Sequence, residues 1–138
     1  MEPYLMKIGY FADGPWAYFS LRNLLSDSSL RIAFVCARND LPDQVLKTMA
    51  EQRNIPFLTH PDVNSPEFFD EIQSYGCELF VSMSFNQIFK PPMIEHPLHG
   101  TINCHAGKLP FYRGRNILNW ALINDETEFG ITVHYVDE

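Results

Sequence analysis

Asn103 and His105 are the two residues whose types and spacing suit acyl transfer. In an extended strand, side chains two positions apart lie on the same face, so this amide would stand beside this imidazole. An amide N–H stabilises charge that develops on a carbonyl oxygen, and an imidazole transfers protons near neutral pH. A structural histidine is the alternative, but here a dense polar loop follows the pair. The same alternation turns Cys104 to the opposite face, where we expect a buried, inert thiol.

Three cations follow this pair within eight residues, at Lys108, Arg113 and Arg115. The chain as a whole is acidic, because 10 Lys and Arg stand against 17 Asp and Glu and give a net charge of −7. Positive charge concentrated beside a candidate site therefore favours an anionic substrate or cofactor. A solvated turn is the alternative interpretation of the same cluster.

Two further loops combine residues that bind ligands. The turn at Gly14 separates an apolar run from a helical pattern, and the helix amides of residues 14–17 would face an anionic group. A tight turn without a ligand is the simpler interpretation, because neither a GxGxxG nor a Walker lysine pattern is present. Residues 82–92 mix small polar and aromatic side chains, which suits a flat heterocycle. An ordinary loop into a short helix is the alternative there.

The elements that must position these loops alternate between strand and helix patterns. Such alternation predicts an α/β fold, namely a Rossmann-like, mainly parallel sheet with helices on both faces. Ligands of these sheets lie outside the carboxyl ends of the strands, so we expect the loops after residues 11, 82 and 104 to form the site. The predicted strands are 5–11, 30–37, 55–58, 77–82, 101–105 and 131–136, and the predicted helices are 16–25, 41–52, 65–75 and 117–123.

Length and composition exclude several classes of protein. A chain of 138 residues predicts one domain. Its three cysteines are widely spaced and form no zinc pattern, so we expect no metal. No apolar run approaches the ~20 residues of a membrane helix, and no signal-peptide pattern opens the chain. We therefore expect a cytoplasmic protein without a membrane partner, and the acidic charge disfavours nucleic acid.

A combination of motifs points to a known family. Asn103-Cys104-His105 is followed by Leu109-Pro110 and then by Tyr112-Arg113-Gly114-Arg115. Together with residues 82–92 and 118–134, this combination resembles the 10-formyltetrahydrofolate-dependent formyltransferases. The similarity covers residues 77–138, whereas the preceding part of the chain agrees in layout only.

The resemblance implies direct transfer of a formyl group from 10-formyltetrahydrofolate to an unprotonated amine, with no metal. Asn103 would stabilise the oxyanion, and His105 would transfer the proton, directly or through a water. The residues implied to bind folate, the first three largely through backbone contacts, are Gln87, Ile88, Phe89, Arg115, Asp137 and Glu138. The residues implied to bind the acceptor substrate are Lys108, Arg113 and Gly14.

The acceptor follows from the branch of the family. The run 112–115 followed by Leu118-Asn119-Trp120 is more similar to the enzymes that formylate nucleotide-linked amino-sugars than to the tRNA enzymes. The net charge of −7 agrees, because a tRNA enzyme favours a basic surface. We therefore expect a nucleotide-linked amino-sugar as the acceptor. The alternatives are a methionyl-tRNA or ribonucleotide formyltransferase, a formyltetrahydrofolate hydrolase, or a folate or nucleotide-sugar binding module without catalysis.

Two departures from the family pattern qualify these expectations. Many relatives read histidine, any residue, serine, two leucines and proline, whereas this sequence has Gly107 and Lys108, which leaves the acceptor open. Relatives also carry a catalytic aspartate on the loop after the last strand, and here that loop begins at Asp137 and Glu138. We therefore expect residues 1–138 to form one N-terminal catalytic domain that is incomplete at its C-terminal end and impaired in catalysis. The family also allows a homodimer of the full-length protein.

Overall fold

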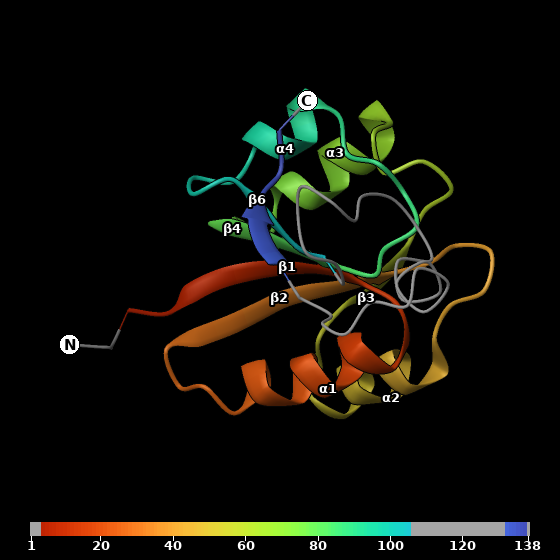
Figure 1. Cartoon of the computed structure of the whole chain (residues 1–138), viewed down its shortest axis with the longest axis vertical. Helices are drawn as coiled ribbons and strands as arrows, with labels where there is room; N and C mark the ends of the chain where they lie inside the picture. Colours follow the sequence, from red (N-terminus) through yellow and green to blue (C-terminus); the bar gives the residue numbers. More distant parts are fainter. Residues whose placement is uncertain (1–3, 106–131, 138) are drawn as a thin grey trace, which may run out of the picture.

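A six-stranded sheet in the order β3-β2-β1-β4-β5-β6 organises the chain (Figure 1). The computed structural model describes residues 4–105 and 132–137, so predictions that fall on residues 1–3, 106–131 and 138 lie outside the described residues. Five strands are parallel, and β6 runs antiparallel to β5. The strands are β1 (Met6–Ala12), β2 (Leu30–Ala37), β3 (Phe57–Thr59), β4 (Leu79–Met83), β5 (Thr101–His105) and β6 (Thr132–Tyr135).

The chain changes direction across the sheet between β1 and β4. It runs outward from β1 through β2 to β3, and then crosses back to place β4 on the other side of β1. In open α/β sheets, the ligand crevice lies at the carboxyl ends of the strands at such a switch point. The loops that follow β1 and β4 therefore border the place where a ligand is expected.

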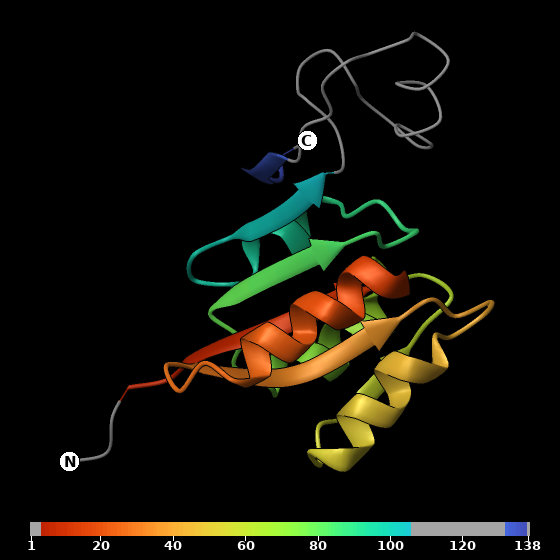
Figure 2. The same cartoon turned by 60° about the horizontal axis from the view of Figure 1, so that its bottom comes forward.

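Helices cover both faces of the sheet, as the sequence predicts. In Figure 2, α1 (Gly14–Leu25) lies across β1 and β2, and α2 (Gln44–Gln52) lies beside it. The helices α3 (Pro66–Gln73) and α4 (Pro91–Glu95) cover the opposite face (Figure 1). Among the described residues, no helix is long and apolar enough to cross a membrane.

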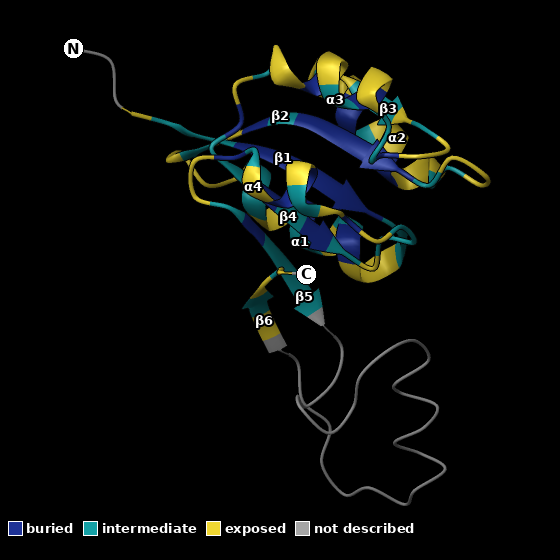
Figure 3. Cartoon of the chain, turned by 90° about the horizontal axis from the view of Figure 1, so that it is seen from above, coloured by how far each residue is buried: buried dark blue, intermediate teal, exposed yellow. Residues whose placement is uncertain are grey.

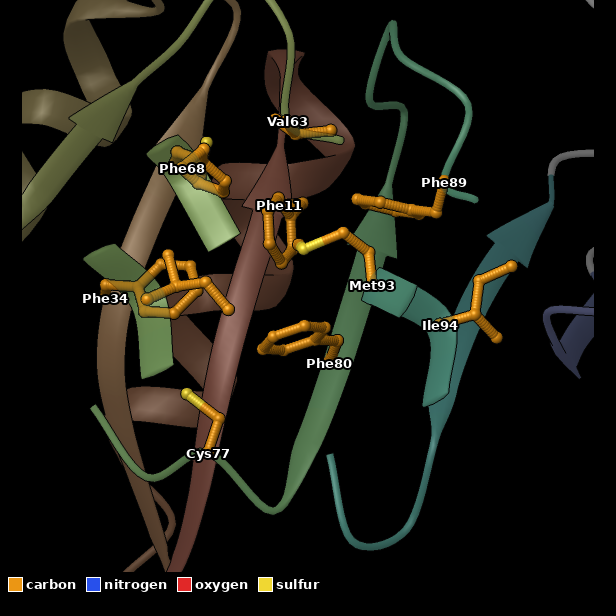
Figure 4. Close-up of a cluster of buried hydrophobic side chains, with 11 residues drawn as sticks. Phe11, Phe34, Val63, Phe68, Cys77, Phe80, Phe89, Met93 and Ile94 are labelled. Atoms are coloured by element: carbon orange, nitrogen blue, oxygen red, sulfur yellow. The ribbon is translucent and has the colours of Figure 1, made fainter. Parts of the chain in front are cut away.

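Phe11 is the centre of the core between the sheet and α3 and α4 (Figure 4). Its ring centroid lies 5.4 Å from that of Phe34, 5.1 Å from that of Phe80 and 4.9 Å from that of Phe89, each in an edge-to-face arrangement. Such pairs stabilise beyond the area they bury, by about 0.5–1.5 kcal/mol each. This aromatic core fixes the ends of β1 and β4 relative to each other.

Tyr10 anchors the other core, beneath α1 and α2. Its buried hydroxyl donates to the carbonyl of Ala17 at 2.7 Å and lies 3.7 Å from the sulfur of Met83. Because Tyr10 and Phe11 face opposite sides, β1 is buried on both faces, as expected of a central strand in a parallel sheet (Figure 3). The first turn of α1 is therefore tied to the end of β4.

Several boundaries differ from the sequence predictions. The first helix begins at Gly14, two residues before the predicted start, because Asp13 already occupies its N-cap position. The second begins at Gln44, because Asp43 accepts from two main-chain N–H groups there, whereas Asp40 pairs with Arg38. The five-residue α4 agrees with the short helix that was expected after the loop of residues 82–92.

The apolar run 77–82 favours a strand that is buried on both faces, and for β4 this expectation is only half right. Phe80 and Ser82 are buried under α3 and α4, but Leu79, Val81 and Met83 on the other face are only partly buried. The reason is that α1 and α2 pack mainly over β1, β2 and β3, so cover on that face thins toward β4. The helix predicted over residues 117–123 lies outside the described residues.

Candidate functional site

The candidate site lies where β1, β4 and β5 end. The main-chain N–H of Asp13 donates to the carbonyl of Met83 at 3.2 Å, which joins the turn after β1 to the end of β4. Strand register places Phe11 beside Ser82, Ser82 beside Asn103, and Asn103 beside His134. Asn103 therefore stands on the face covered by α3 and α4, near the switch point.

Asn103 is half-buried, and its nearest polar partner is His134 on β6. Its Nδ2 lies 3.5 Å from Nε2 of His134, at the long limit of a hydrogen bond, and Nδ1 of His134 lies 3.0 Å from the carbonyl oxygen of Tyr135. A carbonyl oxygen only accepts, so Nδ1 of His134 carries the proton and Nε2 accepts from Asn103. This contact turns the amide nitrogen of Asn103 toward β6.

His134 has no ligand spacing with the other histidines in the sequence, which favours a surface or structural role. Nothing in its local sequence separates it from the other histidines. The signal is the antiparallel register, which sets His134 directly opposite Asn103. Strand register is set when the sheet assembles, so this pairing could not be predicted from the sequence.

His105 is the last residue of β5, two positions after Asn103, and pairs with Thr132 of β6. The other predicted loop residues, Lys108, Arg113, Arg115 and Glu138, lie outside the described residues. Asp137 is exposed and follows the end of β6.

Asp137 is not brought to the carboxyl end of β5. Because β6 is antiparallel, Val136 lies beside the start of β5, where its N–H donates to the carbonyl of Thr101 at 2.8 Å. Asp137 therefore follows at the amino end of β5. A role for this carboxylate beside folate stays a prediction.

The loop after β4 is held in the core by two aromatic rings. Phe89 is 7% exposed, and its ring stacks on that of Phe85 at 5.8 Å with an angle of 8° between the planes. Between them, Ile88 is 86% exposed. Of the three residues predicted to line a pterin pocket, Phe89 thus points its side chain into the core and Ile88 points its side chain outward.

Gln87 binds another loop with its side chain. Its Oε1 accepts from the N–H of Val63 at 2.9 Å, and its Nε2 donates to the carbonyl of His60 at 2.8 Å. The side chain is therefore engaged by protein at both ends of its amide. A contact between the backbone of residue 87 and folate stays a prediction.

Ser84 begins this loop in the left-handed region, with φ of 57°. A residue with a Cβ atom occupies this region at a cost of about 1–2 kcal/mol, and such residues gather at functional sites. The conformation bends the chain away from β4 so that Phe85 enters the core.

The turn after β1 is open and carries negative charge. Gly14 has φ of 82°, and a Cβ atom built there would meet nothing within 4 Å. Burial raises the pKa of Asp13, Asp43 and Asp40 raise it further, and Arg38, 3.7 Å away, opposes them. The expected anionic ligand at Gly14 would thus have the carboxyl group of Asp13 as a neighbour.

The described residues contain no group of three or more histidine, cysteine or acidic side chains placed to hold a metal ion. Cys104 is partly buried, and burial raises the pKa of its thiol. It therefore lacks the lowered pKa of a reactive nucleophile, as the sequence predicts, whereas the predicted full burial is wrong.

Fold and site together match one family. The sequence pattern of the family described as formyl transferase matches residues 25–138. The chain belongs to the formyl transferase family, and its motifs at the end of β5 lie within the matched region.

Two individual relatives of this chain are methionyl-tRNA formyltransferases. The methionyl-tRNA formyltransferase of Geobacter sulfurreducens is 45% identical over 92 residues, which are 67% of this chain and 29% of the relative. That of Citrifermentans bemidjiense is 35% identical over 140 residues, covering 96% of this chain and 44% of the relative. The chain therefore spans less than half the length of these curated relatives.

A solved structure supports the fold. The crystal structure of glycinamide ribonucleotide transformylase 1 from Geobacillus kaustophilus superposes with a TM-score of 0.81 at 21% identity, covering 98% of this chain and 76% of that one. The Rossmann-like fold class is thus confirmed. These relatives are named for tRNA and ribonucleotide acceptors, so they do not support the nucleotide-sugar branch in particular.

Proposed function

We propose that this chain carries the catalytic residues for formyl transfer from 10-formyltetrahydrofolate to a primary amine. The single observation that carries the proposal is the position of Asn103 near the switch point, inside the region that matches the formyl transferase family. Ligands of this sheet type bind at that edge.

Asn103 and His105 divide the chemistry between them. The lone pair of the neutral amine attacks the formyl carbon, and the electrons of the C=O double bond move to its oxygen. The amide N–H of Asn103 stabilises this oxyanion, a contribution of about 2.7–4 kcal/mol for one donor. His105 takes the proton that the amine loses and returns it to N10 of the folate as the carbon–N10 bond breaks. The products are a formamide and tetrahydrofolate.

The loop after β4 is our candidate for the folate contact. Ile88 offers an exposed apolar side chain that a pterin ring would cover, and the rings of the partly buried Phe85 and the buried Phe89 hold the backbone on either side of it. A flat heterocycle is bound by such a combination of apolar cover and fixed main-chain groups.

For the acceptor we propose a nucleotide-linked amino-sugar. The sequence run 112–115 and the net charge of −7 support it, because an acidic protein repels the phosphates of tRNA. Methionyl-tRNA is the second candidate, supported by the names of the relatives at 45% and 35% identity.

The test is an assay with 10-formyltetrahydrofolate and four acceptor conditions: a panel of nucleotide-linked amino-sugars, methionyl-tRNA, glycinamide ribonucleotide, and no acceptor. Asn103→Ala should lower kcat by about 10²–10³-fold, and His105→Ala by about 10²–10⁴-fold. Turnover of methionyl-tRNA alone would replace the amino-sugar assignment. Formate release without acceptor would favour a hydrolase, and folate binding without any turnover would favour a binding module.

We further propose that residues 1–138 act as one catalytic domain. Full activity of this domain needs a catalytic carboxylate that is not among the described residues. The assay is therefore run on the chain itself and on a chimera in which it replaces the matched segment of the Citrifermentans bemidjiense relative. We expect the chimera to turn over faster. Equal rates would contradict this part of the proposal and leave formyl transfer intact.

A further inference from the structure

We propose that Asn64 and Gln87 are positioning residues, which together hold the loop after β4 in its folate-binding shape. We call these two side chains the amide latch. The inference rests on the proposed function, because it assigns a role within the same site. Its basis is a reciprocal set of hydrogen bonds between two loops that lie side by side at the carboxyl end of the sheet.

Each amide binds two main-chain groups of the opposite loop. Gln87 accepts from the N–H of Val63 at 2.9 Å and donates to the carbonyl of His60 at 2.8 Å. Asn64 donates to the carbonyl of Ile88 at 2.7 Å and accepts from the N–H of Lys90 at 2.8 Å. Both the donor and the acceptor of each amide are thus satisfied, which fixes the orientation of the two planes.

The loop that carries Asn64 is itself held in place. Val63 is fully buried in the core shared with Phe89. The N–H of Asn64 donates to Oδ1 of Asp62 at 2.9 Å, and Ser65 caps α3 by accepting from the N–H of Phe68 at 3.2 Å. The latch therefore fastens the loop after β4 to a segment with its own supports.

The latch acts at the residues proposed to contact folate. Phe85 and Phe89 fix the ends of the loop in the core, but Ile88 between them is exposed and has no apolar anchor of its own. Asn64 binds the carbonyl of Ile88. Gln87, the residue before Ile88, binds the carbonyl of His60 in the opposite loop. A ligand bound through main-chain groups needs those groups fixed before it arrives, since a misplacement of about 1 Å costs up to about 10²-fold.

The test compares Asn64→Asp and Gln87→Glu with the native chain. Each change keeps the size of the side chain and one acceptor, but it removes the N–H donor and sets a carboxylate against a carbonyl. Gln73→Glu, which makes the same change at an exposed amide on the same side of the sheet, is the matched control. We measure binding of tetrahydrofolate by fluorescence titration, KM for 10-formyltetrahydrofolate and for the acceptor in the assay above, and hydrogen exchange of the loop amides.

We expect folate affinity to fall about tenfold in each variant, with faster exchange at Ile88 and Lys90, while the acceptor KM and the control stay unchanged. A variant that melts earlier but binds folate as tightly as the native chain overturns the latch, since the role would be only structural. If the native chain itself neither binds folate nor transfers formyl groups, the proposed function fails and the latch falls with it. Native binding with unaffected variants overturns the latch alone.

Discussion

In the proposed reaction the amide of Asn103 must be held so that it can donate, and within the described residues its Nδ2 contacts Nε2 of His134 at 3.5 Å. We predict that His134→Phe lowers kcat about tenfold with a smaller effect on KM, because the amide of Asn103 loses the acceptor that orients it. His134→Gln, which restores an acceptor, should recover part of the rate. Steady-state kinetics on the formyl-transfer assay measure both. An unchanged kcat in His134→Phe would show that Asn103 is oriented by other contacts.

The carboxyl group of Asp13 gives a second test at the residue scale. Its pKa is raised in the folded protein, first by burial and then by Asp43 and Asp40, with Arg38 acting against them. A raised pKa means that the folded state binds the proton more tightly than the unfolded state. The stabilising contribution is therefore present below the unfolded value and is lost as pH rises through the folded pKa.

We predict that Asp13→Asn becomes more stable relative to the native chain as the pH rises from 4 toward 7. Urea unfolding of both proteins at several pH values measures the difference. Asp40→Asn is a control of opposite sign, because the hydrogen bonds from Arg38 lower the pKa of Asp40 and stabilise the chain at higher pH. Parallel pH profiles of Asp13→Asn and the native protein would contradict the raised pKa.

Among the elements, β1 depends on the absence of a side chain at Gly9. A Cβ atom there would lie 2.6 Å from Cζ of Phe34 and 2.8 Å from Cδ1 of Phe80, both of which are fully buried. We predict that Gly9→Ala lowers the free energy of unfolding by about 1–3 kcal/mol, because neither ring can move without disturbing the aromatic core. Denaturant unfolding measures it. Phe34→Leu in the Gly9→Ala background should recover part of the lost stability. If Gly9→Ala leaves the free energy of unfolding unchanged, the rings of Phe34 and Phe80 can move to accept the Cβ atom.

The elements themselves were mostly readable from the sequence. Strands β2 and β5 coincide with the apolar runs 30–37 and 101–105, and α3 begins directly after Ser65, where the predicted helix starts, because these signals are local. The start of α2 was not readable, because Asp40 and Asp43 are both candidates for the cap. Arg38, only two residues before Asp40, pairs with Asp40, and Asp43 caps the helix.

For the site, too, the sequence predicted what local signals and topology determine and missed the contacts between distant segments. The sequence predicted that β1, β4 and β5 end at one carboxyl edge, because a parallel sheet requires it. It did not predict that the side chain of Gln87 binds the loop after β3, or that His134 lies opposite Asn103. Such partners depend on strand register and loop packing, and these are fixed only when the whole sheet assembles.

For the molecule as a whole, β6 is notable because two of its large apolar side chains are exposed. Val133 is 63% exposed and Tyr135 is 70% exposed, and both lie on the face that α1 and α2 leave uncovered. Across the strand pair, Cys104 and Ile102 continue this face and are only partly buried. In the sheet of described strands, β6 also stands last in order, so its outer edge is unpaired. Exposed apolar edges of this kind promote association between chains.

We predict that the 138-residue chain associates as its concentration rises, and that Tyr135→Lys weakens this association. A lysine places a charge on the exposed face, and burying that charge against a second chain is unfavourable. Tyr4→Lys is the matched control, because Tyr4 is 69% exposed but lies outside the strands. Sedimentation velocity over a concentration series gives the measurement. If Tyr4→Lys and Tyr135→Lys reduce association equally, the cause is the added charge on an acidic chain and not the face of β6. If the native chain stays monomeric throughout, this strand is protected by other parts of the protein.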